Sequence, residues 1–470
     1  MQALETRARR SVDGKPRTER TMETIMRTAA NVKTLPQDRA LHAATPAIAA
    51  VETDSQHRCE RALDMLLTQR GDAFAEVERV LADDPGCVFG HCLRAALIVR
   101  AESAALRSAL AASIAAIEAA CPDAGNPARR HALAARAWDS AHAVALYAAI
   151  VADRPHDVLA LAVAHALDFH LGRRRAMCDR IAKVLPHWTA AMPGYASVLA
   201  MYAFALEENG RYGRAERIAR RALALDPKHA GAIHVIAHVM EMQGRALDGL
   251  AFLAAVESAW GEGTGLSVHL AWHRALFHLD AGDPKSALAI YDTQIATAAS
   301  TDMSALADGS ALLWRLYLRD IEVSNRWRPL ADRWTMHNLA DARPFYAVHA
   351  MMAFAAAGRT AAALRLAEAL PSIDIKLASS LIPEDALAAP LGEALLAFAR
   401  SDYAECVKWL KRVRHIAHRC GGSLAQCDLI HLTFTEAALR ARRARLGHAL
   451  VAERTARKPA SRHWPMKSGP

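Results

Sequence analysis

The sequence predicts an all-α fold, an α-solenoid of repeated helical hairpins, and three observations lead to this prediction. Alternating Val/Ile/Thr runs, which indicate half-buried strands, do not appear. Runs of Ala, Leu, Arg and Glu with a helical period fill most of the 470 residues, and 53% of the chain is hydrophobic. A helix–turn–helix unit also recurs along the chain. Because such units pack mainly on their neighbours, the length of the chain does not set the number of domains.

The clearest unit is YAFALEENGRYGRAERIARRALALDP, residues 202–227. It predicts a helix, a turn at Gly210, a second helix and a stop at Pro227. Small residues lie where the two helices of the hairpin approach closely, namely Ala203, Ala215 and Ala222. This is the tetratricopeptide arrangement, in which a hairpin of two helices forms each repeat.

The same spacing recurs on both sides of this unit. Gly244 follows Gly210 by 34 residues, and Gly249 takes the small position five residues later. Two further pairs keep the five-residue offset, Gly282 with Ala287 and Gly358 with Ala363. The sequence therefore predicts a tetratricopeptide-like solenoid of about eight helical hairpins between roughly residues 50 and 458.

The chain divides into three parts. Residues 1–36 form a basic extension that we expect to be disordered, residues 37–458 the helical solenoid, and residues 459–470 a flexible tail. The net charge of +9 belongs to the ends: residues 1–40 hold nine basic and five acidic groups, and residues 440–470 nine and one.

The charge distribution, the apolar patterning and the cysteine spacing argue against several classes of protein. A nucleic-acid-binding domain carries its positive charge on the folded part, among aromatic residues, so we expect no specific nucleic-acid binding. No window is apolar enough to cross a membrane and no secretory signal is present, so we expect a soluble cytoplasmic protein. The eight cysteines form no CxxC pair, which favours small buried residues over zinc ribbons or disulfides.

A polar stretch interrupts one of the clear repeats. It is HVIAHVMEMQGR, residues 234–245. If Gly244 is repeat position 15, then His234, His238 and Glu241 fall at positions 5, 9 and 12. These positions line the concave groove of a tetratricopeptide array, so the three side chains are predicted to share one face.

Neighbouring repeats add polar residues to the same wall. Glu207 falls at position 12 of the preceding repeat, and His269 and Trp272 fall at positions 2 and 5 of the following one. His273 is one step round that helix. Because packed helices lie about 8–10 Å apart, we expect these side chains to converge on one polar cluster.

Two functions fit this wall. The first is a protein- or peptide-binding module whose His/Glu/Trp-lined groove receives an extended segment or a helix. The second is a metalloprotein or an enzyme acting on a small molecule. In that case His234, His238 and Glu241 would bind a divalent transition metal, or His273 and Glu207 would move a proton. The residues leave both functions open, as well as the oligomeric state.

Two other histidine pairs lack carboxylates at helical spacing and are expected to be structural, His165 with His170 and His415 with His418. Three tryptophans on amphipathic helices are expected to anchor the core, Trp314, Trp327 and Trp334.

Several blocks also resemble one family. The blocks YAFALEENGRYGRAE, HVIAHVMEMQGR, HLAWHRALFHLDAGD, SALLWRLYL and VHAMMAFAAAGR resemble, in order, those of the tetratricopeptide repeat protein 38 family. The resemblance runs from about residue 50 to residue 465. It implies a tetratricopeptide-like α-solenoid and a soluble cytoplasmic protein, and it brings no defined activity.

One late block departs from the family pattern. The chain has GGSLAQCD where the family usually has GGSHAQRD, so Leu424 replaces a histidine and Cys427 an arginine. If this block helps to line the functional site, the site is altered in this chain.

Overall fold

The computed structural model describes residues 54–101, 104–138, 141–261, 263–298, 302–339, 342–371 and 385–458. The predicted basic extension, residues 1–36, and the predicted tail, residues 459–470, lie outside these ranges. Within them the chain forms helices and no strand, with a single isolated bridge between Arg70 and Thr264. The all-α prediction is confirmed.

Consecutive helices pack as antiparallel pairs. In the N-terminal part the pairs are α2 (Asp54–Thr68) with α3 (Ala73–Asp83), α4 (Val88–Ala101) with α5 (Arg107–Ala120), α6 (Pro127–Arg136) with α7 (Ala141–Asp153), and α8 (Val158–His170) with α9 (Arg174–Val184). In the middle they are α10 (Tyr195–Glu208) with α11 (Tyr212–Leu225), α12 (Ala230–Met242) with α13 (Ala246–Ala255), and α15 (Ser267–Ala281) with α16 (Pro284–Ile290), with the short α14 (Glu257–Trp260) between the last two pairs.

In the C-terminal part the pairs are α17 (Met303–Leu318) with α18 (Ser324–Trp334), α19 (Pro344–Ala356) with α20 (Thr360–Ala369), α21 (Ala388–Ala399) with α22 (Tyr403–Val413), and α23 (Leu424–Arg440) with α24 (Ala444–Arg457). The described residues thus hold eleven pairs, more than the eight or so that the sequence predicts.

The turns explain this difference. The repeating glycines have left-handed backbones, with φ of 71° at Gly210 and 69° at Gly244, a conformation that favours glycine. In three later turns another residue takes the left-handed conformation, namely Asp320, Ser401 and Arg442. These hairpins carry no glycine signal, so the glycine spacing undercounts the repeats.

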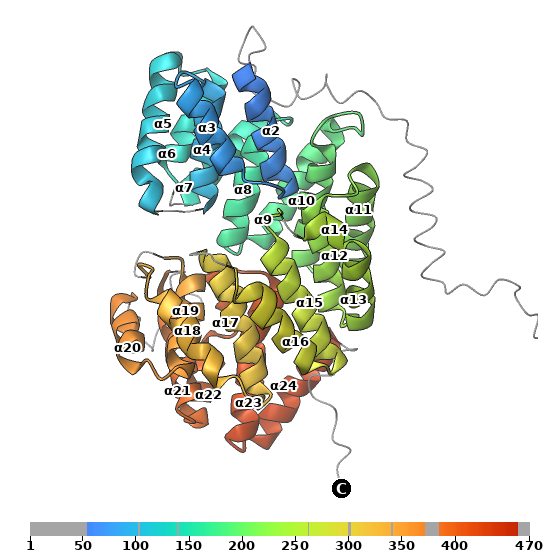
Figure 1. Ribbon diagram of the computed structural model, residues 1–470, viewed down its shortest axis with the longest axis vertical. Coiled ribbons are helices and arrows are strands. Elements are labelled where there is room, and N and C mark those ends of the chain that lie inside the picture. Colours follow the sequence, from blue (N-terminus) through green and yellow to red (C-terminus); the bar gives the residue numbers. More distant parts are fainter. Residues whose placement is uncertain are drawn as a thin grey trace, which may run out of the picture.

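The first helices of successive pairs pack on one another and form the inner layer of a superhelix. The small residues predicted for the hairpin seam are fully buried, as for Ala203 and Ala215. One apolar core extends through the N-terminal pairs as far as α12, and a second extends from α10 through the C-terminal pairs. Figure 1 shows the N-terminal pairs at the top, the C-terminal pairs at the bottom, and α10–α16 joining them along one side.

The superhelix folds back on itself, so that its two ends meet its middle. Helix α23 packs against α12 and α17, and α2 packs against α12. The turn after α2 bonds to the loop before α15, where the Gly71 N–H donates to the Gly263 carbonyl at 2.9 Å. The concave side therefore becomes a partly enclosed cavity.

Candidate functional site

A cavity of about 600 Å³ lies on the inner side of the superhelix. Residues of α2, α3, α4, α8, α10, α12, α15 and α17 line it, together with residues at the starts of α19 and α23. Much of the wall is apolar, from Phe74, Leu97, Phe169, Met201 and Phe204. The volume is typical of a small-molecule site.

The structure separates the seven predicted groove residues into two groups. His234, His238 and His269 line the cavity. The other four lie behind its wall and are buried, namely Glu207, Glu241, Trp272 and His273. Three of the predicted histidines therefore line the cavity, whereas His273, the carboxylates and the tryptophan lie in the layer behind them.

Four histidines from two neighbouring helices form the densest polar group. His234 and His238 are one turn apart on α12, and His269 and His273 one turn apart on α15. One ring nitrogen of each lies within 4.8 Å of the others. The ring centroids are 4.3 Å apart for His234 and His238, and 4.6 Å for His238 and His273.

His238 and His273 are fully buried and His234 and His269 partly buried, and most of the ring nitrogens of the four lack hydrogen bonds. Both nitrogens of His238 and of His273 are buried without a hydrogen-bond partner, as is Nε2 of His234. Burial lowers the pKa of His238 to about 4 and the pKa of His234 and His273 well below the ordinary value. His234, His238 and His273 are therefore neutral at pH 7.

Two carboxylates adjoin the histidine cluster, Asp308 at the cavity wall and Glu207 behind it. The Asp308 carboxylate on α17 lies 2.7 Å from Nδ1 of His269, and the Glu207 carboxylate on α10 lies 3.4 Å from Nδ1 of His238. The sequence identifies Glu207 but gives no signal for Asp308. The turn after α17 has Asp320 in place of glycine, so the repeat register is hidden there.

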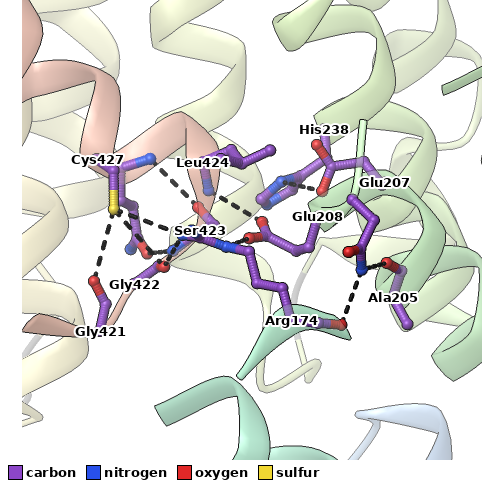
Figure 2. Close-up of polar contacts among 12 residues, drawn as sticks. Arg174, Ala205, Glu207, Glu208, His238, Gly421, Gly422, Ser423, Leu424 and Cys427 are labelled. Carbon is purple, nitrogen blue, oxygen red and sulfur yellow. Dashed lines mark hydrogen bonds and ion pairs between the residues drawn. The ribbon is translucent and has the colours of Figure 1, made fainter. Parts of the chain in front are cut away.

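The late block packs directly against this carboxylate layer (Figure 2). Glu208, next to Glu207, accepts a hydrogen bond from the Leu424 N–H at 3.0 Å. Its carboxylate also forms an ion pair with Arg174, with 2.7 Å to Nε. Arg174 also donates to the Gly422 carbonyl at 3.2 Å and lies 3.8 Å from the Cys427 sulfur. The two departures from the family pattern therefore lie beside the site, and Glu208 and Arg174 are residues that the sequence reasoning missed.

Burial dominates the electrostatics of the adjacent glutamates. It raises the pKa of Glu207 to about 8 and that of Glu208 to about 7. The Glu207 carboxyl has no hydrogen-bond partner within the described part of the chain, while Glu208 is held by Arg174 and Leu424.

Glu241 does not join the predicted metal-binding trio. Its carboxylate lies 2.6 Å from Lys458 Nζ in a buried ion pair, and the groups of close ligand atoms formed by the described residues do not include it. The helical spacing of His234, His238 and Glu241 is as predicted, but Glu241 points to the C-terminal hairpin. The trio is therefore corrected: the two histidines meet His269 and His273 instead.

Trp272 is a core residue. It is fully buried, stacks on His269 at 5.2 Å between ring centroids, and lies under the Arg315 guanidinium at 5.3 Å. It supports the histidine cluster from behind and offers no surface to a ligand.

Three cavity residues on the N-terminal side were not predicted as ligand-binding. His165, expected to be structural, lines the cavity with His170, and burial lowers its pKa to about 3. Arg100 on α4 also lines the cavity, and burial lowers the pKa of its guanidinium. No helix in the described ranges is long and apolar enough to cross a membrane.

Comparison with known proteins supports the repeat. A tetratricopeptide repeat model matches residues 196–239, which span α10, α11 and most of α12. The chain carries a tetratricopeptide repeat. With its all-α stack of hairpins it is a helical-repeat protein of this type, and repeats of this type are found in protein-interaction modules.

Two solved structures show weak similarity over most of the chain. One is a structure of Naa15/Naa10 bound to HypK-THB, 14% identical, covering 93% of this chain and 76% of that one, with a TM-score of 0.30. The other is the tetratricopeptide repeat domain of P58(IPK), 12% identical, covering 83% and 99%, with a TM-score of 0.19.

Proposed function

We propose that this helical-repeat protein is a binding module that holds the carboxylate-bearing end of a mainly apolar ligand in its internal cavity. The observation that carries the proposal is the environment of Arg100. Its guanidinium lines the cavity, and burial alone shifts its pKa, so no carboxylate in the described ranges faces it. A partly buried guanidinium without a counter-ion is costly, and a carboxylate is its best geometric match.

The rest of the cavity suits the body of such a ligand. Phe74 and Leu97 lie on the same side as Arg100, and Phe169, Met201 and Phe204 continue the apolar wall toward the histidines. About 600 Å³ holds a small molecule or the last few residues of a peptide. A helix is roughly 10–12 Å across with its side chains, so several turns do not fit.

A peptide C-terminus and a small apolar carboxylic acid share this chemistry. The first makes the chain a protein-binding module in the usual manner of tetratricopeptide arrays, and the second makes it a carrier or an enzyme of a small acid. In both cases a free carboxylate is the shared feature, which gives a direct test.

The test measures calorimetric binding of two matched probe pairs: decanoate with decanamide, and a Leu-Leu-Phe peptide with its C-terminal amide. We expect at least one free acid to bind and its amide to bind at least about tenfold more weakly, because a hydrogen bond to a charged group contributes about 1.5–3 kcal/mol. Arg100→Met should remove that preference. The matched control is Arg107→Met, on the exposed surface outside this cavity.

The two probe pairs distinguish the sources. Preference for the peptide acid supports a protein partner, and preference for decanoate supports a small molecule. Equal binding of acids and amides, binding unchanged in Arg100→Met, or no binding of either acid would overturn the proposal.

A further inference from the structure

The four histidines have the arrangement of a metal centre. In a tetrahedral zinc site with Zn–N bonds of about 2.0–2.1 Å, the ring centroids lie about 5 Å from one another. The six centroid distances within the cluster run from 4.3 to 6.3 Å. The ring nitrogens, within 4.8 Å of one another, need to close to about 3.3 Å, which small side-chain rotations allow.

Hydrogen bonding within the cluster does not account for the buried nitrogens. Neutral imidazoles can pair through N–H···N bonds, but His238 and His273, both fully buried, make none with either nitrogen. Nε2 of His234 is a fifth buried nitrogen without a partner. Buried polar atoms are nearly always satisfied, so five in one place require an explanation. A cation that accepts one lone pair from each of the three rings accounts for three of these nitrogens, and the Glu207 carboxyl faces a fourth, Nδ1 of His238.

Two carboxylates beside the rings complete the chemistry. Asp308 binds Nδ1 of His269 at 2.7 Å, and Glu207 lies 3.4 Å from Nδ1 of His238. A carboxylate at Nδ1 fixes the tautomer that leaves Nε2 free for a metal and makes that nitrogen more basic. In the described ranges neither carboxylate forms an ion pair with a lysine or arginine. Burial raises the pKa of Glu207 to about 8, so this carboxyl would release its proton as a divalent ion binds beside it.

We propose that His234, His238, His269 and His273 bind one divalent late first-row transition ion, with zinc as the ion to test, and that Asp308 and Glu207 position two of the ligands. Imidazole nitrogen favours zinc, copper and nickel, whereas magnesium and calcium require oxygen ligands. A second group of close ligand atoms, Glu207 and Glu208 with His238, is less suited, because Arg174 already neutralises Glu208.

The ion would lie in the wall of the cavity. His234, His238 and His269 line the cavity and His273 lies behind, so one side of the centre faces any bound ligand. The metal proposal does not depend on the proposed carboxylate binding, since Arg100 belongs to neither the ligands nor their supports.

The experiment titrates zinc into the folded, chelator-treated protein in competition with a chromophoric chelator. We expect one equivalent to bind, and magnesium to give no response. His238→Gln and His273→Gln should each weaken zinc binding at least tenfold. Asp308→Asn should weaken it about tenfold or more, as loss of an orienting carboxylate usually does. The matched control is His278→Gln, a histidine of the same helix that pairs with Asp283 at the surface and should leave binding unchanged.

If a variant fails to fold, measurements on the parent protein alone still test the proposal. Zinc should raise its melting temperature, and cobalt should give the visible absorption of a low-symmetry nitrogen site. A folded parent that takes up no zinc overturns the proposal, as does equal binding by the folded histidine variants. Arg100→Met should bind zinc as the parent does, so a failed carboxylate test and a failed metal test are distinguishable.

Discussion

Lys458, the residue that follows the last helix, forms a buried ion pair with Glu241 in the middle of the chain, with 2.6 Å between Nζ and Oε1. Both side chains are almost completely buried. Asp428 on α23 lies 3.8 Å from the same ammonium and 3.0 Å from the Arg454 guanidinium. Burial by itself would raise the pKa of Asp428, and the two cations overcome it and hold that pKa well below its ordinary value.

Removing one charge of this pair should strongly destabilise the protein. In Glu241→Gln the buried ammonium keeps only the more distant Asp428 carboxylate, and loss of one partner of a buried pair typically costs about 3–5 kcal/mol. We expect a marked fall in the urea midpoint. The double variant Glu241→Gln, Lys458→Met should recover part of the loss.

An exposed ion pair provides the control for this substitution. Glu405 pairs with Lys408 at the surface of α22, where such pairs contribute at most about 1 kcal/mol. Glu405→Gln should therefore barely move the midpoint. An equally small effect of Glu241→Gln would show that the ion pair between Glu241 and Lys458 does not stabilise the fold.

His229 predicts a pH dependence of stability. Its neutral Nδ1 accepts from the Ala232 N–H and caps α12, and Nε2 lies 2.9 Å from the Ser197 hydroxyl. Burial lowers its pKa to about 4, with smaller opposing effects of Asp226, which raises it, and Arg70, which lowers it. The folded state therefore binds fewer protons than the unfolded one, and the stabilisation is complete above about pH 6.5 and is lost as the pH falls toward 4.

The measurement compares melting temperatures at pH 7 and pH 5. The parent should lose about 2 kcal/mol from this group over that range. His229→Asn, which keeps an N-capping side chain that does not titrate, should lose correspondingly less. The exposed His187→Asn is the control and should follow the parent. Parallel curves for the parent and His229→Asn would contradict the prediction.

Gly249 on α13 tests how tightly the hairpins pack. A Cβ built there would lie 2.5 Å from the Phe277 ring of α15, so Gly249→Ala must displace a buried aromatic side chain. Overpacking of this kind costs about 1–3 kcal/mol. At Gly213, on the exposed side of α11, a Cβ meets nothing within 4 Å, and Gly213→Ala should stabilise by up to about 1 kcal/mol. Urea midpoints that shift in the same direction would contradict the assigned packing.

Cys87 should be the most reactive thiol. The structure places it, partly exposed, just before α4, where the Gly90 N–H points at its sulfur at 3.4 Å. The Cys59 thiol, 3.7 Å away, is the main cause that lowers the pKa of Cys87 to about 7. Iodoacetamide at pH 7 should therefore alkylate Cys87 several-fold faster than the partly exposed Cys178, whose pKa is raised by burial.

Peptide mass spectrometry over a time course measures the alkylation rates. Cys59→Ala removes the thiol donor and should slow alkylation of Cys87 several-fold. Modification of Cys178 before Cys87 would refute the assignment.

The fold was predictable because its signals are local. The glycines at the turns of the clear repeats, Gly210, Gly244 and Gly282, have a left-handed backbone, and Ala203 and Ala215 must be small where two helices touch. The histidine cluster was predictable for the same reason, since a four-residue spacing on two adjacent helices places the rings on facing surfaces.

The partners of these histidines were not predictable. Asp308, Arg174 and Lys458 reach the site from distant parts of the chain, and their positions depend on how the superhelix curves. Glu241 illustrates the limit: its helical position is as predicted, but its partner lies 217 residues away. Spacing within a helix says which residues share a face and does not say which charge lies opposite.

The ion pair between Glu241 and Lys458 has a consequence for folding during synthesis. Most helical-repeat proteins are dominated by contacts between neighbours in sequence, so their hairpins can fold as they leave the ribosome. Here Lys458, the ion-pair partner of Glu241, is synthesised 217 residues later. The first ten hairpins can therefore assemble in order, but the wall behind the histidines is complete only when the last helix arrives. The wall of the cavity is therefore complete only after Lys458 has been synthesised, and a nascent chain stalled before α24 would hold an unfinished site.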